Sequence, residues 1–333
     1  MTHLSSSPHC PEPSFPMTPV VTVCFTSHRA ETIPFALPFM EQHDVIVLEE
    51  APNENLLPLL KKKMSVDTYI LEEGFEFPEF SKRYYRLLRS LHARGKEIVQ
   101  VEPYLERLIC IHTLFAEGKQ PSDIEQSPSL NIVYRAEREA TRALFRYYEA
   151  SMTAPFDEVI ESVRNFATSD AVRFRIRDTM RAHAIAHLVR DEKKYYIETG
   201  GIHRFLVKIL RNLCRGRWTM RVETLMTPEY ERLTGQQDVL APGDILTLHY
   251  VFGKRENVSF ERLLAARSLI YIMLLEKNEM LPSRAVRAPH LENEIAVTRF
   301  VNRLSLSQCR ELFETMRSHS RREALEIAAS HLA

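Results

Sequence analysis

Residues 195–203 read YYIETGGIH, and this stretch decides the fold that the sequence predicts. Two adjacent glycines, Gly200 and Gly201, mark a place where the backbone had little alternative, since the 333 residues include only nine glycines. They follow an apolar run and precede a segment, 205–210, with apolar residues at helical spacing. The order strand, glycine turn, helix places His203 at the carboxyl end of a strand, where α/β proteins bind ligands.

Three earlier segments also read as strands that end in polar residues. They are 20–25, which leads to His28; 44–48, which is followed by Glu49 and Glu50; and 97–101, which is followed by Glu102. Histidines and carboxylates that share one sheet edge can form a metal site or an acid–base site. Strands also end in polar residues simply because they reach solvent, and this explanation suffices for any single position.

Composition indicates an ordinary globular chain, with 44% hydrophobic and 26% charged residues. Lys and Arg together number 44, as do Asp and Glu, and this balance predicts neither a nucleic-acid nor a membrane partner. The five cysteines are scattered without a CxxC pair, which predicts reduced thiols in a cytoplasmic protein. The most apolar late stretch, 263–275, is far too short for a membrane span.

The sequence predicts an α/β fold with a mostly parallel or mixed central sheet flanked by helices. Residues 1–19 are proline-rich and lack an apolar core, which indicates a disordered leader rather than a signal peptide. The α/β domain is expected over 20–252, with its last strand at 245–252 after a Pro-Gly-Asp turn. Residues 257–333 read as a helical C-terminal extension.

A helical insertion is expected at about 127–190, because this region is almost free of glycine. Pro155 and the pair Ser169-Asp170 divide it into three predicted helices, the second break offering N-cap chemistry.

Arg177 lies within an apolar stripe when 171–188 is plotted as a helix. A guanidinium is rarely buried without a partner, so Arg177 is expected to meet an anion or a carboxylate. Glu50 and Glu102, at strand ends, are the natural candidates. An ordinary internal ion pair, or a side chain that extends to the rim of the stripe, explains the pattern equally well.

Four short segments, taken in their order along the chain, resemble the superfamily that joins the TraB, Tiki, erythromycin-esterase and ChaN-like proteins. The segments that carry the resemblance are Phe25-Thr26-Ser27-His28, Val47-Leu48-Glu49-Glu50, Arg177-Asp178-Thr179-Met180 and Gly200-Gly201-Ile202-His203. The first departs from the family pattern, because Phe25 stands where the family usually has glycine. Which of the two adjacent glutamates aligns stays open.

The resemblance implies a polar pocket at the sheet edge. Members of the superfamily carry out metal-dependent proteolysis or esterase-type hydrolysis, bind haem, or regulate without catalysis. The catalytic residues that it implies are His28, Glu50, Glu102, Arg177 and His203. The ligands that it implies for a divalent metal are His28, Glu49, Glu50 and His203, with haem as the alternative cofactor. In such a pocket a histidine or the metal activates water, and the arginine neutralises the developing oxyanion.

Three functions follow as hypotheses. The first is a hydrolase of amide or ester bonds, metal-assisted or not, acting on a small molecule or a peptide. The second is a binding or regulatory protein that uses the same pocket for haem, a metal or a small anion, and Phe25 favours it. The third is an interaction module in which the helices of 257–333 form a homo-oligomer.

Overall fold

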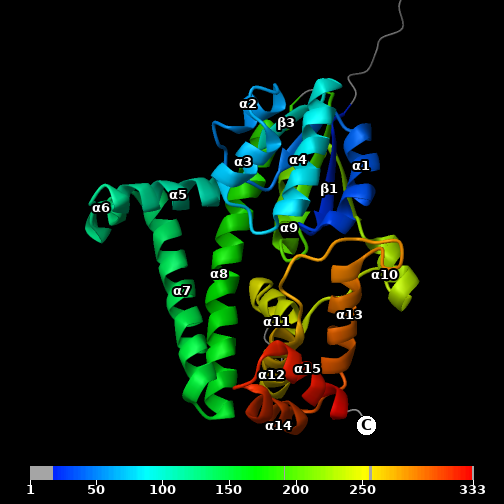
Figure 1. Cartoon of the computed structure of the whole chain (residues 1–333). Coiled ribbons are helices and arrows are strands. Elements are labelled where there is room, and N and C mark those ends of the chain that lie inside the picture. Colours follow the sequence, from blue (N-terminus) through cyan, green and yellow to red (C-terminus); the bar gives the residue numbers. More distant parts are fainter. Residues whose placement is uncertain (1–17, 191, 255–256, 332–333) are drawn as a thin grey trace, which may run out of the picture.

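The computed structural model describes residues 18–190, 192–254 and 257–331 (Figure 1). The predicted leader, 1–19, therefore lies outside the described residues except for its last two positions. The described chain contains one sheet of five parallel strands in the order β3-β2-β4-β1-β5. The strands are β1 (Val20–Thr26), β2 (Val45–Leu48), β3 (Glu97–Gln100), β4 (Lys194–Gly200) and β5 (Thr219–Thr224). The predicted α/β class is confirmed, and the sheet is wholly parallel.

Helices cover both faces of the sheet and continue beyond it. Those between β1 and β4 are η1 (Ala30–Thr32), α1 (Ile33–Gln42), α2 (Leu56–Leu60), α3 (Val66–Glu73), α4 (Pro78–Ala93), α5 (Pro103–Ala116), α6 (Pro121–Glu125), α7 (Pro128–Thr153) and α8 (Phe156–Leu188). Those after β4 are α9 (Arg204–Cys214), α10 (Thr227–Thr234), α11 (Pro242–Val251), α12 (Val258–Leu274), α13 (Pro289–Val301), α14 (Leu306–Met316) and α15 (Arg321–Ser330).

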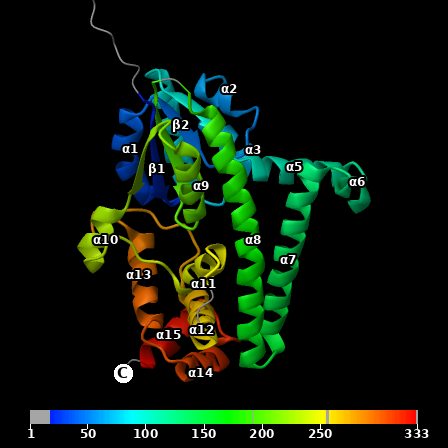
Figure 2. The ribbon, with the colours of Figure 1, turned by 180° about the vertical axis from the view of Figure 1, so that it is seen from behind.

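The two central strands, β1 and β4, are buried along almost their whole length. Both faces of a parallel sheet are covered, so such strands read as nearly continuous apolar runs. One face packs against α1, α3 and α4, and the other against α8 and α9 (Figures 1 and 2). In the β1–β4 register Thr26 lies beside Gly200, so the two histidine-bearing turns leave the sheet at the same edge.

Helix α8 connects the sheet to the rest of the molecule. Its 33 residues span about 50 Å, and its C-terminal part packs on the sheet while its N-terminal part packs against α7, α11 and α12 (Figure 1). The predicted break at Pro155 is confirmed, since α7 ends at Thr153 and α8 begins at Phe156. The predicted break at Ser169-Asp170 is wrong. Asp170 does not cap a helix there, because its carboxylate pairs with Arg173 one turn later.

The strand predicted at 245–252 is also wrong, because this segment belongs to helix α11. Pro242 occupies the first turn, and Asp244 places a negative charge beside the helix N-terminus. Leu246, Leu248 and Val251 are buried, and the helix packs against α8 and α12. A short apolar run fits a strand or a buried helix equally well by periodicity, and tertiary packing decides here for the helix.

The helical extension predicted at 257–333 is confirmed over its described residues, which contain α12 to α15. Ser305 caps α14 by accepting a hydrogen bond from the backbone of Gln308, as its position predicts. Among the described helices, none is both long enough and apolar enough to cross a membrane.

Candidate active site

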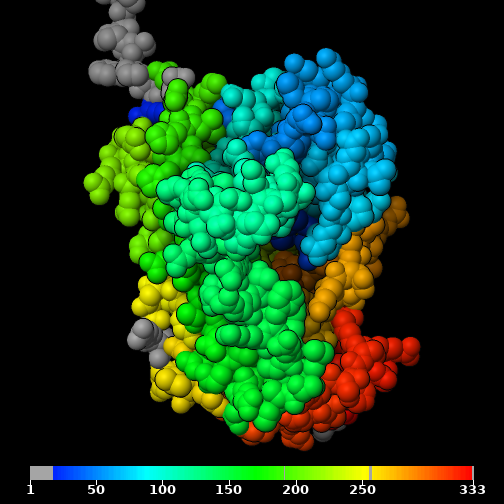
Figure 3. All heavy atoms as spheres, turned by 90° about the vertical axis from the view of Figure 1, so that its left-hand side faces the viewer, coloured from blue at the N-terminus to red at the C-terminus, as the bar shows by residue number. Residues whose placement is uncertain are grey.

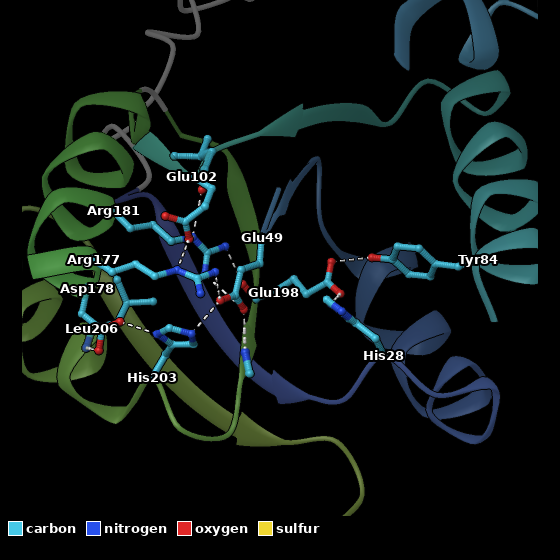
Figure 4. A network of polar contacts seen from close by, with 12 residues as sticks. His28, Glu49, Tyr84, Glu102, Arg177, Asp178, Arg181, Glu198, His203 and Leu206 are labelled. Carbon is cyan, nitrogen blue, oxygen red and sulfur yellow. Dashed lines mark hydrogen bonds and ion pairs between the residues drawn. The ribbon is translucent and has the colours of Figure 1, made fainter. Parts of the chain in front are cut away.

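Two groups of polar side chains meet at the carboxyl edge of the sheet (Figure 4). We call the first the arginine network; it consists of Glu49, Glu102, Arg177, Asp178, Arg181 and His203. The second is the His28–Glu198 pair, which lies on the α4 side of the same edge. The sequence-predicted residues are thus near one another but divided between two arrangements.

Arg177 reaches from α8 to the ends of two strands. Its Nε donates to Oε2 of Glu102 at 3.1 Å, and its Nη2 donates to Oε1 of Glu49 at 3.0 Å. The predicted carboxylate partner is confirmed for Glu102, whereas the second partner is Glu49 and not Glu50. The side chain is 21% exposed, and among the described residues Nη1 receives no partner. The Nη1 amino group of a fixed guanidinium therefore stays available to an anion.

Arg181 lies one turn further along α8 and is buried. Its Nε donates to the carbonyl of Val101 at 2.9 Å, and its Nη2 donates to the carbonyl of Glu198 at 2.7 Å. Its Nη1 lies 3.6 Å from Oε2 of Glu49. Arg181 lies on the same apolar stripe of 171–188 as Arg177 and was not among the predicted site residues. The structure shows that it ties α8 to the ends of β3 and β4.

His203 is held from both sides and is only 5% exposed. Its Nδ1 lies 2.5 Å from Oδ1 of Asp178, and its Nε2 lies 2.9 Å from Oε1 of Glu49. Burial alone would lower the pKa of His203, but the two carboxylates outweigh it and raise the pKa to about 9. The imidazole is therefore protonated at neutral pH and donates both N–H groups.

Asp178 also anchors the start of α9, because its Oδ2 accepts the backbone N–H of Leu206 at 3.0 Å. Glu49 accepts a further bond from the backbone N–H of Gly200 at 2.7 Å. Burial would raise the pKa of Glu49, yet His203, Arg181 and Arg177 together hold it well below its ordinary value. Three carboxylates thus face three cationic groups, which is the condition under which buried charges are tolerated.

The glycine turn lies where the sequence places it. Neither Gly200 nor Gly201 has a positive φ. A Cβ at Gly200 would lie 3.6 Å from the His203 ring and 3.8 Å from Glu49, which are ordinary contacts. A Cβ at Gly201 would meet no atom within 4 Å, so neither the backbone conformation nor the space around the turn requires glycine at these two positions.

The predicted metal ligands do not form a coordination shell. Both nitrogens of His203 already face carboxylates, and Glu49 faces two guanidinium groups. A divalent cation there would lie beside positive charge and would need a histidine lone pair that is not offered. Among the described residues, no group of three or more His, Cys, Asp or Glu side chains is arranged to hold a metal ion.

Glu50, predicted as a catalytic residue and a ligand, points away from the arginine network. Its Oε1 accepts the hydroxyl of Tyr85 at 2.5 Å, and its Oε2 accepts Nε2 of Gln100 at 2.9 Å. Burial raises the pKa of Glu50, and these two hydrogen bonds oppose the rise. Glu50 therefore lies on the α4 side of the sheet, with the His28–Glu198 pair.

His28 is the most accessible member of the site, since its side chain is 53% exposed. Its Nε2 lies 3.5 Å from Oε1 of Glu198, and its ring stacks on Phe80. Glu198 is buried, and its Oε2 accepts the hydroxyl of Tyr84 at 2.5 Å. Burial lowers the pKa of His28, but the hydrogen bond and charge of Glu198 outweigh it and raise the pKa.

Glu198 was missed by sequence reasoning, although a signal exists. It is the charged residue inside the apolar strand that ends at Gly200, and a buried carboxylate in a central strand needs a partner.

Figure 3 shows a hollow on one face of the molecule. Dark blue atoms from the beginning of the described chain form the floor of a hollow between α4, the α5–α7 segment and the C-terminal helices.

Phe25 is buried below the first histidine turn. The guanidinium of Arg204 lies 5.5 Å over its ring. The ring therefore supports the turn from below instead of allowing a ligand to approach the backbone.

A comparison with descriptions of protein families finds no match, and a comparison with solved structures finds none either. An uncharacterized protein of Archaeoglobus fulgidus is 34% identical to this chain over 293 residues, which cover 87% of this chain and 97% of the archaeal protein.

Proposed function

We propose that this chain, which belongs to the same protein family as the Archaeoglobus fulgidus protein, hydrolyses ester or amide bonds. The observation that carries the proposal is the His28–Glu198 pair: a half-exposed imidazole beside a buried carboxylate at the carboxyl edge of the sheet. The resemblance to TraB, Tiki, erythromycin-esterase and ChaN-like proteins supports it further.

His28 acts in this proposal as the general base that takes a proton from water. Nε2 faces Glu198, which orients the ring, and Tyr84 in turn fixes the carboxylate by its hydroxyl. A base is effective when its pKa lies near the working pH. Because Glu198 raises the pKa of His28, hydrolysis is expected to increase with pH from neutral into mildly alkaline solution.

Arg177 binds the anionic partner of the reaction. Its free Nη1 serves the oxyanion or a substrate carboxylate, while Glu49 and Glu102 hold the guanidinium in place. His203 positions Glu49 and does not exchange protons at neutral pH, because both its nitrogens donate. Since the carboxylates and histidines do not fit a divalent metal, no step of this mechanism passes through one.

A second function is favoured by the same Nη1 and by the bulk of Phe25: binding of a small anion without catalysis. In that case the His28–Glu198 pair is a structural contact at the rim. The two functions differ in one measurable property, which is turnover.

The test is hydrolysis of a panel of p-nitrophenyl esters and peptides by the full chain and by His28→Ala. Because His28→Ala removes the general base, this variant is expected to hydrolyse the substrate about 10²- to 10⁴-fold more slowly. The exposed His319→Ala is the control and is expected to retain full turnover. Absence of turnover across the panel would overturn the hydrolase, and full turnover by His28→Ala would overturn the role of His28.

A further inference from the structure

A cavity of about 250 Å³ lies at the same sheet edge, between the strand ends and helix α13. Ser27 and Ile202, the residues immediately before the two histidines, contribute to its wall. The opposite wall comes from α10, α11 and α13, which follow the sheet in the chain. Its volume is just below the range of about 300–1,000 Å³ that is typical of ligand pockets, which indicates a small ligand.

The cavity is acidic. Four carboxyl groups line it, those of Glu31, Asp238, Asp244 and Glu294, against the single guanidinium of Arg204. Arg204 is paired with Asp238, and Glu31 accepts the first two backbone N–H groups of α13. His290 also lines the cavity, and burial lowers its pKa to about 4, so it adds no charge at neutral pH. Among the described residues, Asp244 and Glu294 form no salt bridge, although the charge of Arg204 acts on Asp244 from the same wall.

In the part of the chain that the structure describes, these two half-buried carboxyls form no salt bridge. Within the described chain Glu294 forms no hydrogen bond or salt bridge, and Asp244 forms no salt bridge. Burial raises the pKa of Glu294 to about 7 and that of Asp244 to about 6. Arg29 lowers the pKa of Glu294 from outside the lining, and its guanidinium lies over the ring of Phe77.

A third polar group in the cavity independently lacks a partner. Thr298 is only 3% exposed and lines the cavity, and no described residue accepts or donates a hydrogen bond at its hydroxyl. A buried hydroxyl without a partner costs free energy unless a ligand or water supplies one. An ammonium group, which is a donor only, can serve both the hydroxyl oxygen and the nearby carboxylates.

Three aromatic side chains also line the cavity, together with several aliphatic ones. Tyr230 and Tyr271 stand beside the acidic groups, and Phe25 closes the sheet side. Aromatic faces attract cations and pack well against flat apolar bodies. A glycine at position 25 would leave the cavity without the aromatic ring on its sheet side.

We propose that this cavity binds a small organic cation, an ammonium group carried on an aromatic body, through Glu294 and Asp244. Identifying this cation as the recognition group of a substrate rests on the proposed hydrolase function, because the cavity adjoins the His28 and His203 turns. Binding of the cation does not depend on that function.

The test is calorimetric titration of the full chain with benzylamine and with benzyl alcohol, its neutral counterpart of nearly equal size. Benzylamine is expected to bind at least about tenfold more tightly, in line with hydrogen bonds to charged groups. Glu294→Gln is expected to remove about tenfold or more of the benzylamine affinity, and the exposed Glu311→Gln is expected to change nothing. Asp244→Asn is the second variant if Glu294→Gln does not fold.

Equal affinity for amine and alcohol, or an unchanged affinity in both acidic-site variants, overturns the proposal. The two proposals fail separately. Amine binding that depends on Glu294, without hydrolysis of any ester or peptide, overturns the hydrolase and supports the cation site. Hydrolysis without amine binding overturns the cation site and supports the hydrolase.

Discussion

The two histidines at the sheet edge occupy equivalent turns, yet their surroundings differ in kind. His203 is buried and each of its nitrogens faces a carboxylate, whereas the side chain of His28 is half-exposed and has a single partner, Glu198. An imidazole fixed on both sides supports structure, and one fixed on one side can still exchange a proton with water. The comparison assigns stability to the His203 turn and reactivity to the His28 turn.

The largest effect on stability is expected from the centre of the arginine network. Glu49→Gln keeps the shape of the side chain but removes the negative charge that faces Arg177, Arg181 and His203. Removal of one partner from a buried charge network costs about 3–5 kcal/mol, because the remaining charges stay buried. The free energy of unfolding in urea measures this loss.

Glu97→Gln is the matched control, since this glutamate forms an exposed salt bridge with Lys193 at the opposite end of the sheet. Its loss is expected to be at most about 1 kcal/mol. Equal losses for the two variants would show that the network contributes no more than a surface pair.

The second prediction concerns pH. The folded state raises the pKa of His203 from 6.5 to about 9, so the protonated histidine stabilises the fold. That contribution is complete below pH 6.5 and is lost as the pH rises through 9, and it amounts to about 3 kcal/mol. The difference in unfolding free energy between the natural protein and His203→Gln should therefore shrink over this interval.

The same pair of measurements on His28 provides the contrast. Glu198 raises its pKa too, but the side chain is half-exposed and solvent screens the interaction. The difference between the natural protein and His28→Gln should change far less over the same pH interval. A larger pH dependence for His28 would reverse the roles given to the two turns.

The sequence predicts the edge of the sheet well because strand ends are a local property. Apolar runs that close in polar residues place His28, Glu102 and His203 correctly, and the helical stripe predicts that Arg177 meets carboxylates. Each of these inferences needs only a few neighbouring residues. Parallel pairing then brings the ends together without further information.

The choice between Glu49 and Glu50 needs more than the sequence. Adjacent residues at a strand end point to opposite faces, so one glutamate joins α8 and the other joins Tyr85 on α4. Nothing in the strand itself says which helix covers which face. The predicted metal ligands are therefore divided, with Glu49 beside His203 and Glu50 on the same side of the sheet as His28.

The cavity could not be predicted from the sequence either, because its walls come from segments that are far apart along the chain. Asp244 and Glu294, the two acidic residues of the proposed site, belong to α11 and α13, and α11 was predicted as a strand. Glu294 follows Phe25 by more than 250 residues, and no local pattern connects them. A site between the sheet and an appended helix depends on tertiary packing alone.

The smallest effect on stability is expected for His28→Ala, and this makes it the sharpest test of the comparison. His28 is half-exposed and Glu198 keeps its hydrogen bond from Tyr84, so the unfolding free energy should change by no more than about 1 kcal/mol. His203→Ala should cost several times as much, because it leaves Asp178 and Glu49 buried without their shared partner. If His28→Ala unfolds the protein as readily as His203→Ala, the first turn is structural. Its loss of turnover would then say nothing about proton transfer.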